Sequence, residues 1–400
     1  MARIAIIGGS LGGLLAANLL LRDGHDAFIL EKSTSSLDGR GAGIVTHQPL
    51  LDALAQCGLA TDASLGVQVS SRVALAKSGE EIARTSMPQI LTSWSRLYAM
   101  LLSGFEPQRY VMGADVSSLS QSQHGVQMRT QDGRTFEADL AIASDGIRSG
   151  VRATLANQVL AEYAGYVAWR GVCEESVLSA HCLSSLFNHF GFGLPEGEQI
   201  IGYPVAGANN ATQVGKRRYN FVWYRSADHA ALKTLMTDAD GHHYPLGIPP
   251  SKVAKHHIAS ARLAAHQLLA PQFAEILEKT TQPFLQPIYD CSSKRIAFER
   301  IALMGDAAFV ARPHVGMGVT KAAQDAQALA QSIAKFGATP AALQAYESLR
   351  LGAGQAVVQR GRQLGAYLQA KHPHNEPASK PARDALGVMR STAIDLSVSI

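Results

Sequence analysis

The stretch RIAIIGGSLGGLLAANLLLRDGHDAFILEKS, residues 3–33, decides the fold. It opens with a short apolar run that is typical of a buried strand. Residues 10–24 then place apolar side chains every three or four positions, which predicts a helix that ends at Gly24. A second strand-like run follows over residues 25–33. The stretch therefore predicts a strand–helix–strand unit of an α/β protein.

The glycines of this unit indicate an anion site at the first turn. Gly8 gives the tight turn and Gly13 the close contact between strand and helix, while the amides and dipole at the helix N-terminus stabilise a pyrophosphate. Glu31 ends the second strand, where a dinucleotide fold places the acid that binds a ribose hydroxyl. Ser10 replaces the middle glycine, and its small side chain can donate to phosphate. A glycine-rich turn in an unrelated α/β protein is the alternative at this point.

The composition excludes several classes of protein. The chain has 400 residues, 46% of them hydrophobic, which favours two lobes, and its 36 basic and 32 acidic residues form no basic run of the kind that nucleic-acid binders need. Its cysteines lack a CxxC pair, which argues against disulfides, a metal site and a dithiol centre and favours a reducing cytoplasm. The apolar run from Ile4 to Leu20 is broken by glycines, so we expect neither a signal peptide nor a membrane span.

Two further buried strands are predicted by ADLAIASDG (138–146) and RIALMGDAA (300–308), and each ends in an acidic loop. Between them, residues 163–290 hold aromatic, alternating segments separated by turns, which predicts an inserted lobe with an antiparallel sheet. Residues 319–337 and 340–371 read as helices. We assign no chemistry to the last thirty or so residues.

Both acidic loops carry motifs. The first is DGIRSGVR, residues 145–152; the second is GDAA, residues 305–308, followed by RPHVGMG, residues 312–318. Asp306 can accept hydrogen bonds from a sugar-alcohol chain, and the glycine loop after it leads into a helix whose N-terminus favours negative charge. Three motifs in this order are far more specific than any one of them.

In this order and spacing, the chain resembles the group A flavoprotein aromatic hydroxylases over most of its length, to about residue 365. Within that family, the segments RGAGIVTHQPL, YAGYVAWRGV, IIGYPV and NFVWY are most similar to the enzymes that hydroxylate hydroxypyridines. The resemblance implies a Rossmann-like FAD-binding domain with an inserted antiparallel β-sheet substrate domain and C-terminal helices. The implied parts are FAD-binding segments at 1–72, 95–162 and 291–345, substrate-domain segments at 73–94 and 163–290, and C-terminal helices with a tail at 346–400.

The resemblance also implies non-covalent FAD, with NADH or NADPH as co-substrate. The pyrophosphate and ribose would lie against Gly8, Ser10, Leu11, Gly13, Glu31 and Lys32, with Arg40 and Arg96 also on the cofactor. The motif with Asp145, Gly146 and Arg148 would serve both FAD and the pyridine nucleotide. Gly305 and Asp306 would hold the ribityl chain, and Pro313, Gly316, Met317 and Gly318 would face the isoalloxazine.

Two positions depart from the family pattern. Many relatives have an arginine where this chain has Trp94, with Arg96 displaced by two residues, which puts a phosphate contact in doubt. Many also have a histidine where this chain has Phe309, which reshapes the pocket.

In such enzymes NAD(P)H reduces the flavin, O₂ forms a flavin C4a-hydroperoxide, and its distal oxygen attacks an electron-rich ring carbon. A base near neutral pH would help by removing a proton from the substrate hydroxyl. His47 is our candidate because it follows GAGIV, although a histidine hydrogen-bonded in a domain interface is the competing interpretation. Tyr203 and His314 are further catalytic candidates, and aromatic residues on a sheet are more often core than pocket.

Two other functions remain open at this point: an FAD-dependent reductase or dehydrogenase of a small hydrophobic substrate, and a non-enzymatic flavin-binding protein. Oxygen consumption with product formation separates them from a monooxygenase. We expect a small aromatic substrate, O₂ and NAD(P)H as partners, with no nucleic acid and no membrane. Both a monomer and a homodimer are compatible with the sequence.

Overall fold

The computed structural model describes residues 1–37, 43–245, 247–369 and 384–395. Its first layer is a six-stranded sheet in the order β16-β17-β10-β1-β2-β6. All neighbours in it run parallel except β16, which is antiparallel to β17. The strands are β1 (Arg3–Ile7), β2 (Asp26–Glu31), β6 (Tyr110–Met112), β10 (Leu140–Ala143), β16 (Ala297–Phe298) and β17 (Ile301–Leu303).

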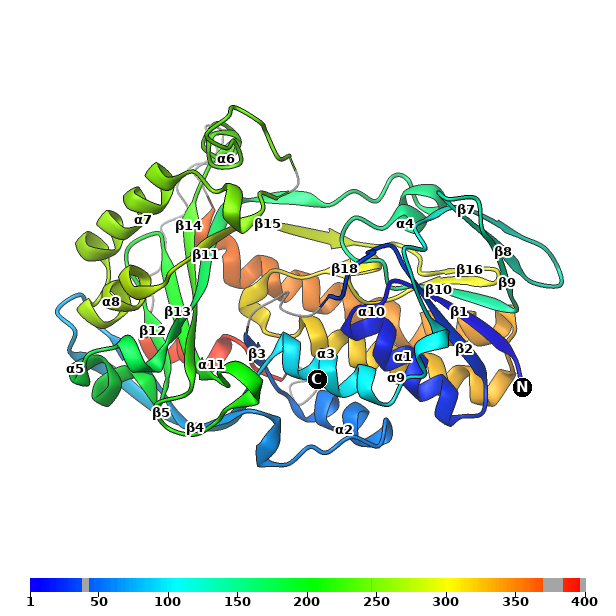
Figure 1. Cartoon of the computed structure of the whole chain (residues 1–400), viewed down its shortest axis with the longest axis horizontal. Helices are drawn as coiled ribbons and strands as arrows, with labels where there is room; N and C mark the ends of the chain where they lie inside the picture. The colour runs from blue at the N-terminus through cyan, green and yellow to red at the C-terminus, as the bar shows by residue number, and fades with distance from the viewer. Residues whose placement is uncertain (38–42, 246, 370–383, 396–400) are drawn as a thin grey trace.

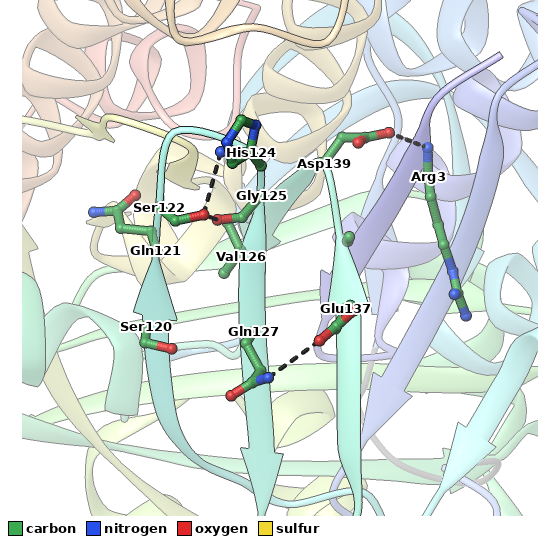
Figure 2. A pocket seen from close by; sticks show the side chains of 11 residues that line it. Arg3, Ser120, Gln121, Ser122, His124, Gly125, Val126, Gln127, Glu137 and Asp139 are labelled. Carbon is green, nitrogen blue, oxygen red and sulfur yellow. Dashed lines mark hydrogen bonds between the residues drawn. The ribbon is translucent and has the colours of Figure 1, made fainter.

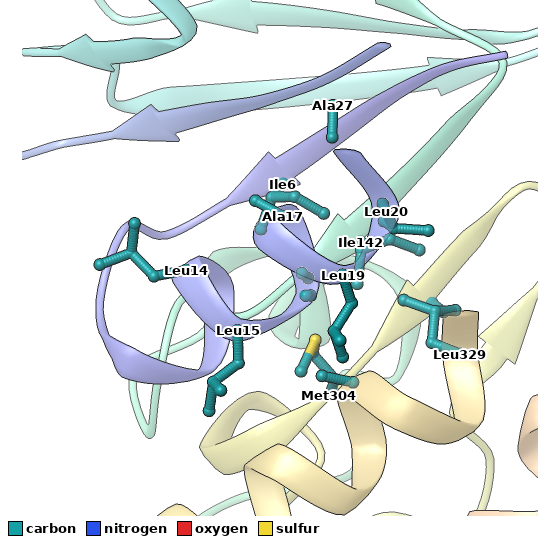
Figure 3. Close-up of a cluster of buried hydrophobic side chains, with 14 of the residues drawn as sticks. Ile6, Leu14, Leu15, Ala17, Leu19, Leu20, Ala27, Ile142, Met304 and Leu329 are labelled. Carbon is teal, nitrogen blue, oxygen red and sulfur yellow. The ribbon is translucent and has the colours of Figure 1, made fainter. Parts of the chain in front are cut away.

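Helix α1 (Leu11–Arg22) packs between this sheet and helix α9 (Gly318–Phe336). Figure 3 shows Leu15 and Leu19 of α1 lying near Met304 and Leu329, and all four are buried. Burying each such side chain contributes about 1.5–3 kcal/mol. The strand–helix–strand unit predicted from residues 3–33 is therefore present and forms the centre of this lobe.

The first turn has room for glycine alone at two positions, Gly8 and Gly13. Gly8 has φ +104°, and a Cβ there would lie 2.4 Å from the main-chain oxygen of Ser144 at the end of β10. A Cβ on Gly13 would lie 2.0 Å from the main-chain oxygen of Gly8. Only glycine fits where the chain approaches itself this closely.

The second layer is a nine-stranded sheet in the order β18-β15-β11-β14-β13-β12-β4-β5-β3 (Figure 1). Its neighbours are antiparallel except β12 and β4, which run parallel. The strands are β3 (Gly43–Val45), β4 (Val67–Leu75), β5 (Glu81–Ser93), β11 (Glu162–Glu174), β12 (Phe190–Gly193), β13 (Gln199–Val205), β14 (Arg218–Ser226), β15 (Phe284–Ser292) and β18 (Phe309–Val310).

Period-2 alternation divides the side chains of this sheet between its two faces. Trp169, Phe221 and Trp223 belong to the core that contains helix α8, whereas Tyr166 and Tyr224 belong to a second core on the opposite face. Figure 1 shows α7 and α8 covering the outer side of the sheet. The aromatic segments of the sequence thus supply both a face covered by helices and a face turned toward the loop of residues 310–319.

The remaining elements complete the two lobes. A separate three-stranded antiparallel sheet contains β7 (Val116–Gln121), β8 (Val126–Thr130) and β9 (Thr135–Ala138). The other helices are α2 (Gln48–Gln56), α3 (Trp94–Ser103), α4 (Gly150–Leu155), α5 (Ala180–Cys182), α6 (His229–Leu235), α7 (Lys255–Leu268), α8 (Pro271–Lys279), α10 (Pro340–Gly365) and α11 (Ala385–Ser391). Within the described ranges, no helix is long and apolar enough to cross a membrane.

Two features go beyond what the sequence predicted. Strands β3, β4 and β5 pair into the second sheet, where β4 runs parallel to β12, and residues 163–290 also hold four helices, α5 to α8. The C-terminal segment, to which we assigned no chemistry, contains α11, which packs against β4 and β5. Both features depend on contacts between distant segments. The domain boundaries themselves stay a prediction.

Candidate active site

The loops after β1, β10 and β17 meet at one edge of the six-stranded sheet, as the carboxyl ends of parallel strands must. The described residues line two cavities there. The turn cavity, of about 430 Å³, is lined by the glycine turn after β1, by the end of β2 and by the loop at Asp145. The sheet cavity, of about 330 Å³, lies between the inner face of the nine-stranded sheet and the loop at residues 310–319. Trp94 lines both cavities.

The glycine turn is held by side chains around it. The Gly9 amide donates to Glu31 Oε2 at 2.7 Å, and the Ser33 amide donates to Glu31 Oε1 at 2.8 Å. The Tyr110 hydroxyl donates to the main-chain oxygen of Gly9 at 2.8 Å. Glu31 therefore orders the turn and still lines the turn cavity, where its free lone pairs can accept from a ligand hydroxyl.

The turn cavity contains seven of the residues that we predicted to bind the cofactor. They are Gly8, Ser10, Glu31, Lys32, Asp145, Gly146 and Arg148. Ser10 precedes α1 and its side chain makes no capping hydrogen bond within the helix. Leu11 and Gly13 do not line either cavity, because they form the first turn of α1 against β1.

Arg152 joins the two acidic loops. Its guanidinium donates to the main-chain oxygen of Ala307 at 2.8 Å and to that of Ile147. The same motif carries Asp145, whose pKa is raised by burial while hydrogen bonds, including one from the Val151 amide, oppose the rise. Arg152 belongs to the DGIRSGVR motif, but the sequence alone did not show that its side chain connects the two loops.

The loop after β17 is fixed from α9. The Gly305 amide donates to Asp325 Oδ2 at 3.0 Å, and the Arg350 guanidinium donates to Asp325 Oδ1 at 2.7 Å. Asp306 lines the sheet cavity with its side chain half exposed, and the fully buried Lys321 ammonium lies 3.9 Å from it. Pro313, Gly316, Met317 and Gly318 line the same cavity, whereas Gly305 does not.

The opposite wall of the sheet cavity comes from β11, β13, β14 and β15. It carries Arg170, Tyr203, Tyr224 and Gln286. The Arg170 Nη1 donates to Gln286 Oε1 at 2.6 Å. Sequence analysis named Tyr203 and missed Arg170 and Gln286. The signal for Arg170 was its alternation with Tyr166 and Ala168, which puts a cation on an otherwise apolar strand face.

His314 is buried behind this cavity. Its Nε2 lies 2.7 Å from the Tyr166 hydroxyl, and its ring centroid lies 4.1 Å from that of Tyr224. Neither His314 nor Tyr166 lines the sheet cavity. Contact with a ring bound there would therefore be made by Tyr224, with His314 packed behind it.

His47 does not line the sheet cavity. Its Nδ1 lies 3.1 Å from Thr320 Oγ1 and its Nε2 lies 3.4 Å from the main-chain oxygen of Ala393. His47 lines a different cavity, together with Asp395. Its partner Ala393, in contrast, lines the sheet cavity. The geometry matches the competing interpretation, a histidine bonded in an interface, because both ring nitrogens already have protein partners.

The two departures from the family pattern are also placed. Trp94 begins α3 at the junction of the two cavities and stacks on Tyr98 with centroids 4.8 Å apart. Arg96 lies two residues further along α3 and lines neither cavity, so its contact with the cofactor stays a prediction. Phe309 is fully buried in β18. Arg40 lies outside the described residues.

A further pocket lies on the three-stranded sheet, away from these loops (Figure 2). Its polar residues form hydrogen bonds with one another. The Gln127 side-chain amide donates to Glu137 Oε1 at 3.1 Å, and the Arg3 main-chain amide donates to Asp139 Oδ2 at 2.8 Å. No cluster of three metal-ligating side chains occurs in the part of the chain that the structure describes. The turn and sheet cavities are therefore the candidate active site.

FAD fits these two cavities. The turn cavity offers a helix N-terminus and a glycine turn that a Cβ would close, which suits a pyrophosphate. The sheet cavity offers a carboxylate at Asp306 for sugar-alcohol hydroxyls and an aromatic-lined slot for a ring system. Because Trp94 lines both, a long dinucleotide can extend from one into the other.

Comparison with known proteins agrees with this geometry. The sequence profile described as FAD binding domain matches residues 1–190 and 257–361, and one described as FAD binding domain-like matches residues 163–290. The chain is 34% identical over 370 residues to 2,6-dihydroxypyridine 3-monooxygenase of Paenarthrobacter nicotinovorans, covering 92% of this chain and 91% of the relative. It is 25% identical to 6-hydroxynicotinate 3-monooxygenase of Pseudomonas fluorescens, covering 84% of this chain and 83% of the relative.

Solved structures give the same result. The structure of 2,6-dihydroxypyridine-3-hydroxylase from Arthrobacter nicotinovorans superposes with a TM-score of 0.86 at 31% identity, covering 96% of this chain and 99% of that one. Klebsiella pneumoniae HpxO complexed with FAD and uric acid has the same fold, with a TM-score of 0.75 at 22% identity, covering 90% of this chain and 87% of that one.

Proposed function

The chain belongs to the FAD binding domain family and is an FAD-dependent monooxygenase, and on that premise we propose that its substrate is a small hydroxypyridine-like ring. The 34%-identical relative is named for action on 2,6-dihydroxypyridine, and a more distant one for action on 6-hydroxynicotinate. The observation that carries the proposal is the sheet cavity, which places aromatic and polar side chains opposite the loop of residues 313–318.

The cavity is sized for one small ring. It measures about 330 Å³, and part of that space would be taken by the flavin ring system. Ile201, Val222 and Ile288 supply apolar surface, while Arg170, Tyr203 and Tyr224 supply polar atoms. An apolar slot with a few convergent polar groups is the usual form of a site for a small aromatic molecule.

When bound, FAD supplies the redox chemistry, in which a hydride from NAD(P)H and then O₂ lead to transfer of one oxygen atom to the ring. We propose that Gly8 and Ser10 hold the pyrophosphate and that Glu31 binds a ribose hydroxyl. Asp306 would accept from the ribityl hydroxyls, and Gly316 and Gly318 would face the isoalloxazine at the N-terminus of α9, whose dipole favours negative charge there.

The protein must also keep water from the reacting ring. Three segments that are far apart in sequence close the sheet cavity: Trp94, the loop at Arg312, and Ala393 of the C-terminal segment. Arg312 is held by Asp290, with Nε and Oδ2 2.8 Å apart. We propose that this enclosure limits the loss of oxygen as peroxide.

The pyridine nucleotide is proposed to use the loop of residues 145–152, since Arg148 and Lys32 both line the turn cavity.

The proposed division into lobes is the one given by the sequence, with FAD-binding segments at 1–72, 95–162 and 291–345. The four cysteines are all free thiols, as a reducing cytoplasm would leave them. Assembly as a homodimer remains a proposal that size measurement in solution would test.

A direct test is incubation of the FAD-loaded enzyme with NAD(P)H, isotopically labelled O₂ and a panel of hydroxypyridines and phenols. We expect stimulated NAD(P)H oxidation and a product that carries one labelled oxygen atom. Reaction without a ring substrate serves as the control and should yield mainly peroxide. Products without labelled oxygen would contradict the proposal, as would a colourless protein that FAD cannot reconstitute.

A further inference from the structure

The sheet side of the sheet cavity has an excess of hydrogen-bond donors over acceptors. Among the described residues that line the cavity, Asp306 is the one carboxylate, and it belongs to the opposite loop; none is a histidine. The sheet instead contributes Arg170, Tyr203 and Tyr224. A donor surplus of this kind indicates a ligand that is rich in acceptors.

Arg170 is a cation without a charged partner. Its Nη1 donates to Gln286 Oε1 at 2.6 Å, its Nε is buried without a hydrogen-bond partner, and no ion pair within the described residues involves it. Arg312, on the same cavity, is by contrast paired with Asp290 at 2.8 Å. Arg170 is half-buried and lines the cavity, and a charge partly removed from water is stabilised by an anion, so Arg170 is a binding group that lacks its anion.

Two fully buried groups on the neighbouring strand β14 are also unsatisfied. The Tyr224 hydroxyl has no partner, and neither does Asn220 Nδ2, although Asn220 Oδ1 accepts from the Gly43 amide at 3.2 Å. Burial raises the pKa of Tyr203 to about 12 and that of Tyr224 further, while the charge of Arg170 acts in the opposite direction. Both phenols therefore stay protonated near neutral pH and can donate, and neither can serve there as a base.

We propose that Arg170 binds an anionic oxygen carried on the substrate ring, so that the enzyme takes its substrate as the ring oxyanion and rejects the neutral ring. Gln286 positions the guanidinium, and the phenols of Tyr203 and Tyr224 are the further donors. This proposal rests on the proposed function. A ring oxyanion pushes electron density onto the carbon that accepts oxygen, and its proton is left in the solvent, so the cavity needs no base of its own.

Three small probes test the charge that the site selects. The FAD-loaded enzyme is titrated with 2,6-dihydroxypyridine, with 2,6-dimethoxypyridine, which cannot ionise at oxygen, and with pyridine-3-carboxylate, which has a carboxylate and no ring hydroxyl. Dissociation constants come from the absorbance change of the bound flavin, so no turnover is needed. We expect the dihydroxy probe to bind roughly 10- to 100-fold more tightly than the dimethoxy ether, as a charge-assisted contact would give.

Variants assign that preference to Arg170. Arg170→Met should remove most of the preference, and Arg170→Lys should restore part of it because it keeps the charge without the fork geometry. Gln286→Glu should weaken the dihydroxy probe as well, since its carboxylate would neutralise Arg170. Arg218→Met is the matched control, because Arg218 lies on β14 and pairs with Glu174 at the surface.

The outcomes separate this inference from the proposed function. Equal affinity of wild-type enzyme for the dihydroxy and dimethoxy probes would overturn the inference, and so would a preference that Arg170→Met leaves intact or preferred binding of pyridine-3-carboxylate. None of these results would touch oxygen incorporation by the wild-type enzyme. If the dihydroxy probe binds with the expected preference while no ring is hydroxylated, the proposed function fails and the anion site stands.

Discussion

The turn cavity is made mainly by backbone: a glycine turn, the amide of Gly9 on Glu31, and the N-terminus of α1. The sheet cavity is made by side chains from four strands, from the loop at Arg312 and from Ala393 near the C-terminus. The first gathers short motifs that lie between residues 7 and 150, and the second gathers single side chains up to 350 positions apart, from Gly43 to Ala393. A cofactor site can therefore be indicated by short motifs, whereas a substrate site depends on the whole fold.

This difference predicts how each cavity fails. A site built from main chain has no room for added atoms, so even one added methyl group should abolish cofactor binding. A side-chain site should lose affinity or tightness in proportion to the group removed and keep its cofactor. The predictions below test that contrast, starting with the largest expected effect.

Gly8→Ala should abolish FAD binding and destabilise the fold. The added Cβ would lie 2.4 Å from the Ser144 oxygen, and alanine is strained at φ +104°. The measurements are flavin content after reconstitution and thermal unfolding. Gly24→Ala is the control, since Gly24 has φ +82° with nothing within 4 Å of a Cβ, and it should cost only about 1 kcal/mol. Similar losses in both variants would show that conformation, not contact, limits the turn.

Arg72→Met should loosen the C-terminal wall of the sheet cavity. The buried Arg72 guanidinium donates to the main-chain oxygens of Met389, Thr392 and Ala393, and to Gln89. Removing it leaves buried carbonyls unpaired, with an expected loss of about 3–5 kcal/mol in the free energy of unfolding.

We expect Arg72→Met also to release more peroxide per NAD(P)H while retaining FAD, because Ala393 would no longer be held against the cavity. Thermal unfolding, flavin content and peroxide yield are the measurements. Arg84→Met, which breaks an exposed pair with Glu81, is the control and should change none of them appreciably. Unchanged coupling in Arg72→Met would show that Ala393 does not close the cavity.

The sequence was sufficient for the parts that short motifs specify. The period of residues 10–24 and the glycines around Ser10 predicted α1 and the turn, and the motifs at Asp145 and Asp306 predicted two loops that the structure brings together. Family, fold class and monooxygenase chemistry followed from the same motifs and are confirmed by the comparisons.

The rest could not be read in this way. The pairing of β4 with β12 joins residues more than 100 positions apart, and nothing in either strand specifies its partner. Arg170 is one charge in an aromatic strand, and its exposure to a cavity depends on which face the helices cover. Ala393 belongs to a C-terminal segment that contains no motif. Arg72, whose guanidinium donates to the main-chain oxygen of Ala393, lies more than 300 positions away on β4.

Asp306→Ala should weaken FAD binding by a moderate amount. The ribityl hydroxyls would lose an ionised acceptor worth about 1.5–3 kcal/mol, or roughly 10- to 150-fold in the dissociation constant. Equilibrium titration of the apoprotein with FAD measures it. Asp132→Ala, in an exposed turn beside Arg134, is the control and should bind FAD as the parent does. An unchanged constant in Asp306→Ala would remove Asp306 from the cofactor site.

His47→Gln should have the smallest effect on catalysis and a distinct effect on stability. Burial lowers the pKa of His47 below 6.5, and the charge of Arg72 lowers it further, while the Ala393 carbonyl and Asp395 act in the opposite direction. Above pH 6.5 both folded and unfolded chains hold a neutral ring. As the pH falls below 6.5, the unfolded chain takes up the proton first, so the free energy of unfolding decreases by up to about 1.4 kcal/mol for each unit of pKa lowering.

This contribution of His47 to the decrease in unfolding free energy stops growing once the pH has fallen below the pKa of the folded state. It should be absent in His47→Gln, since glutamine does not titrate. Unfolding temperatures of the FAD-loaded proteins between about pH 5 and 8 measure this. Rapid mixing of the reduced enzyme with O₂ and a hydroxypyridine then decides the role of the residue. An oxygen-transfer rate equal to that of the parent agrees with its place beside Thr320 and Ala393, whereas a fall of roughly 10²-fold or more would restore His47 as the base and show that the sheet cavity extends to it.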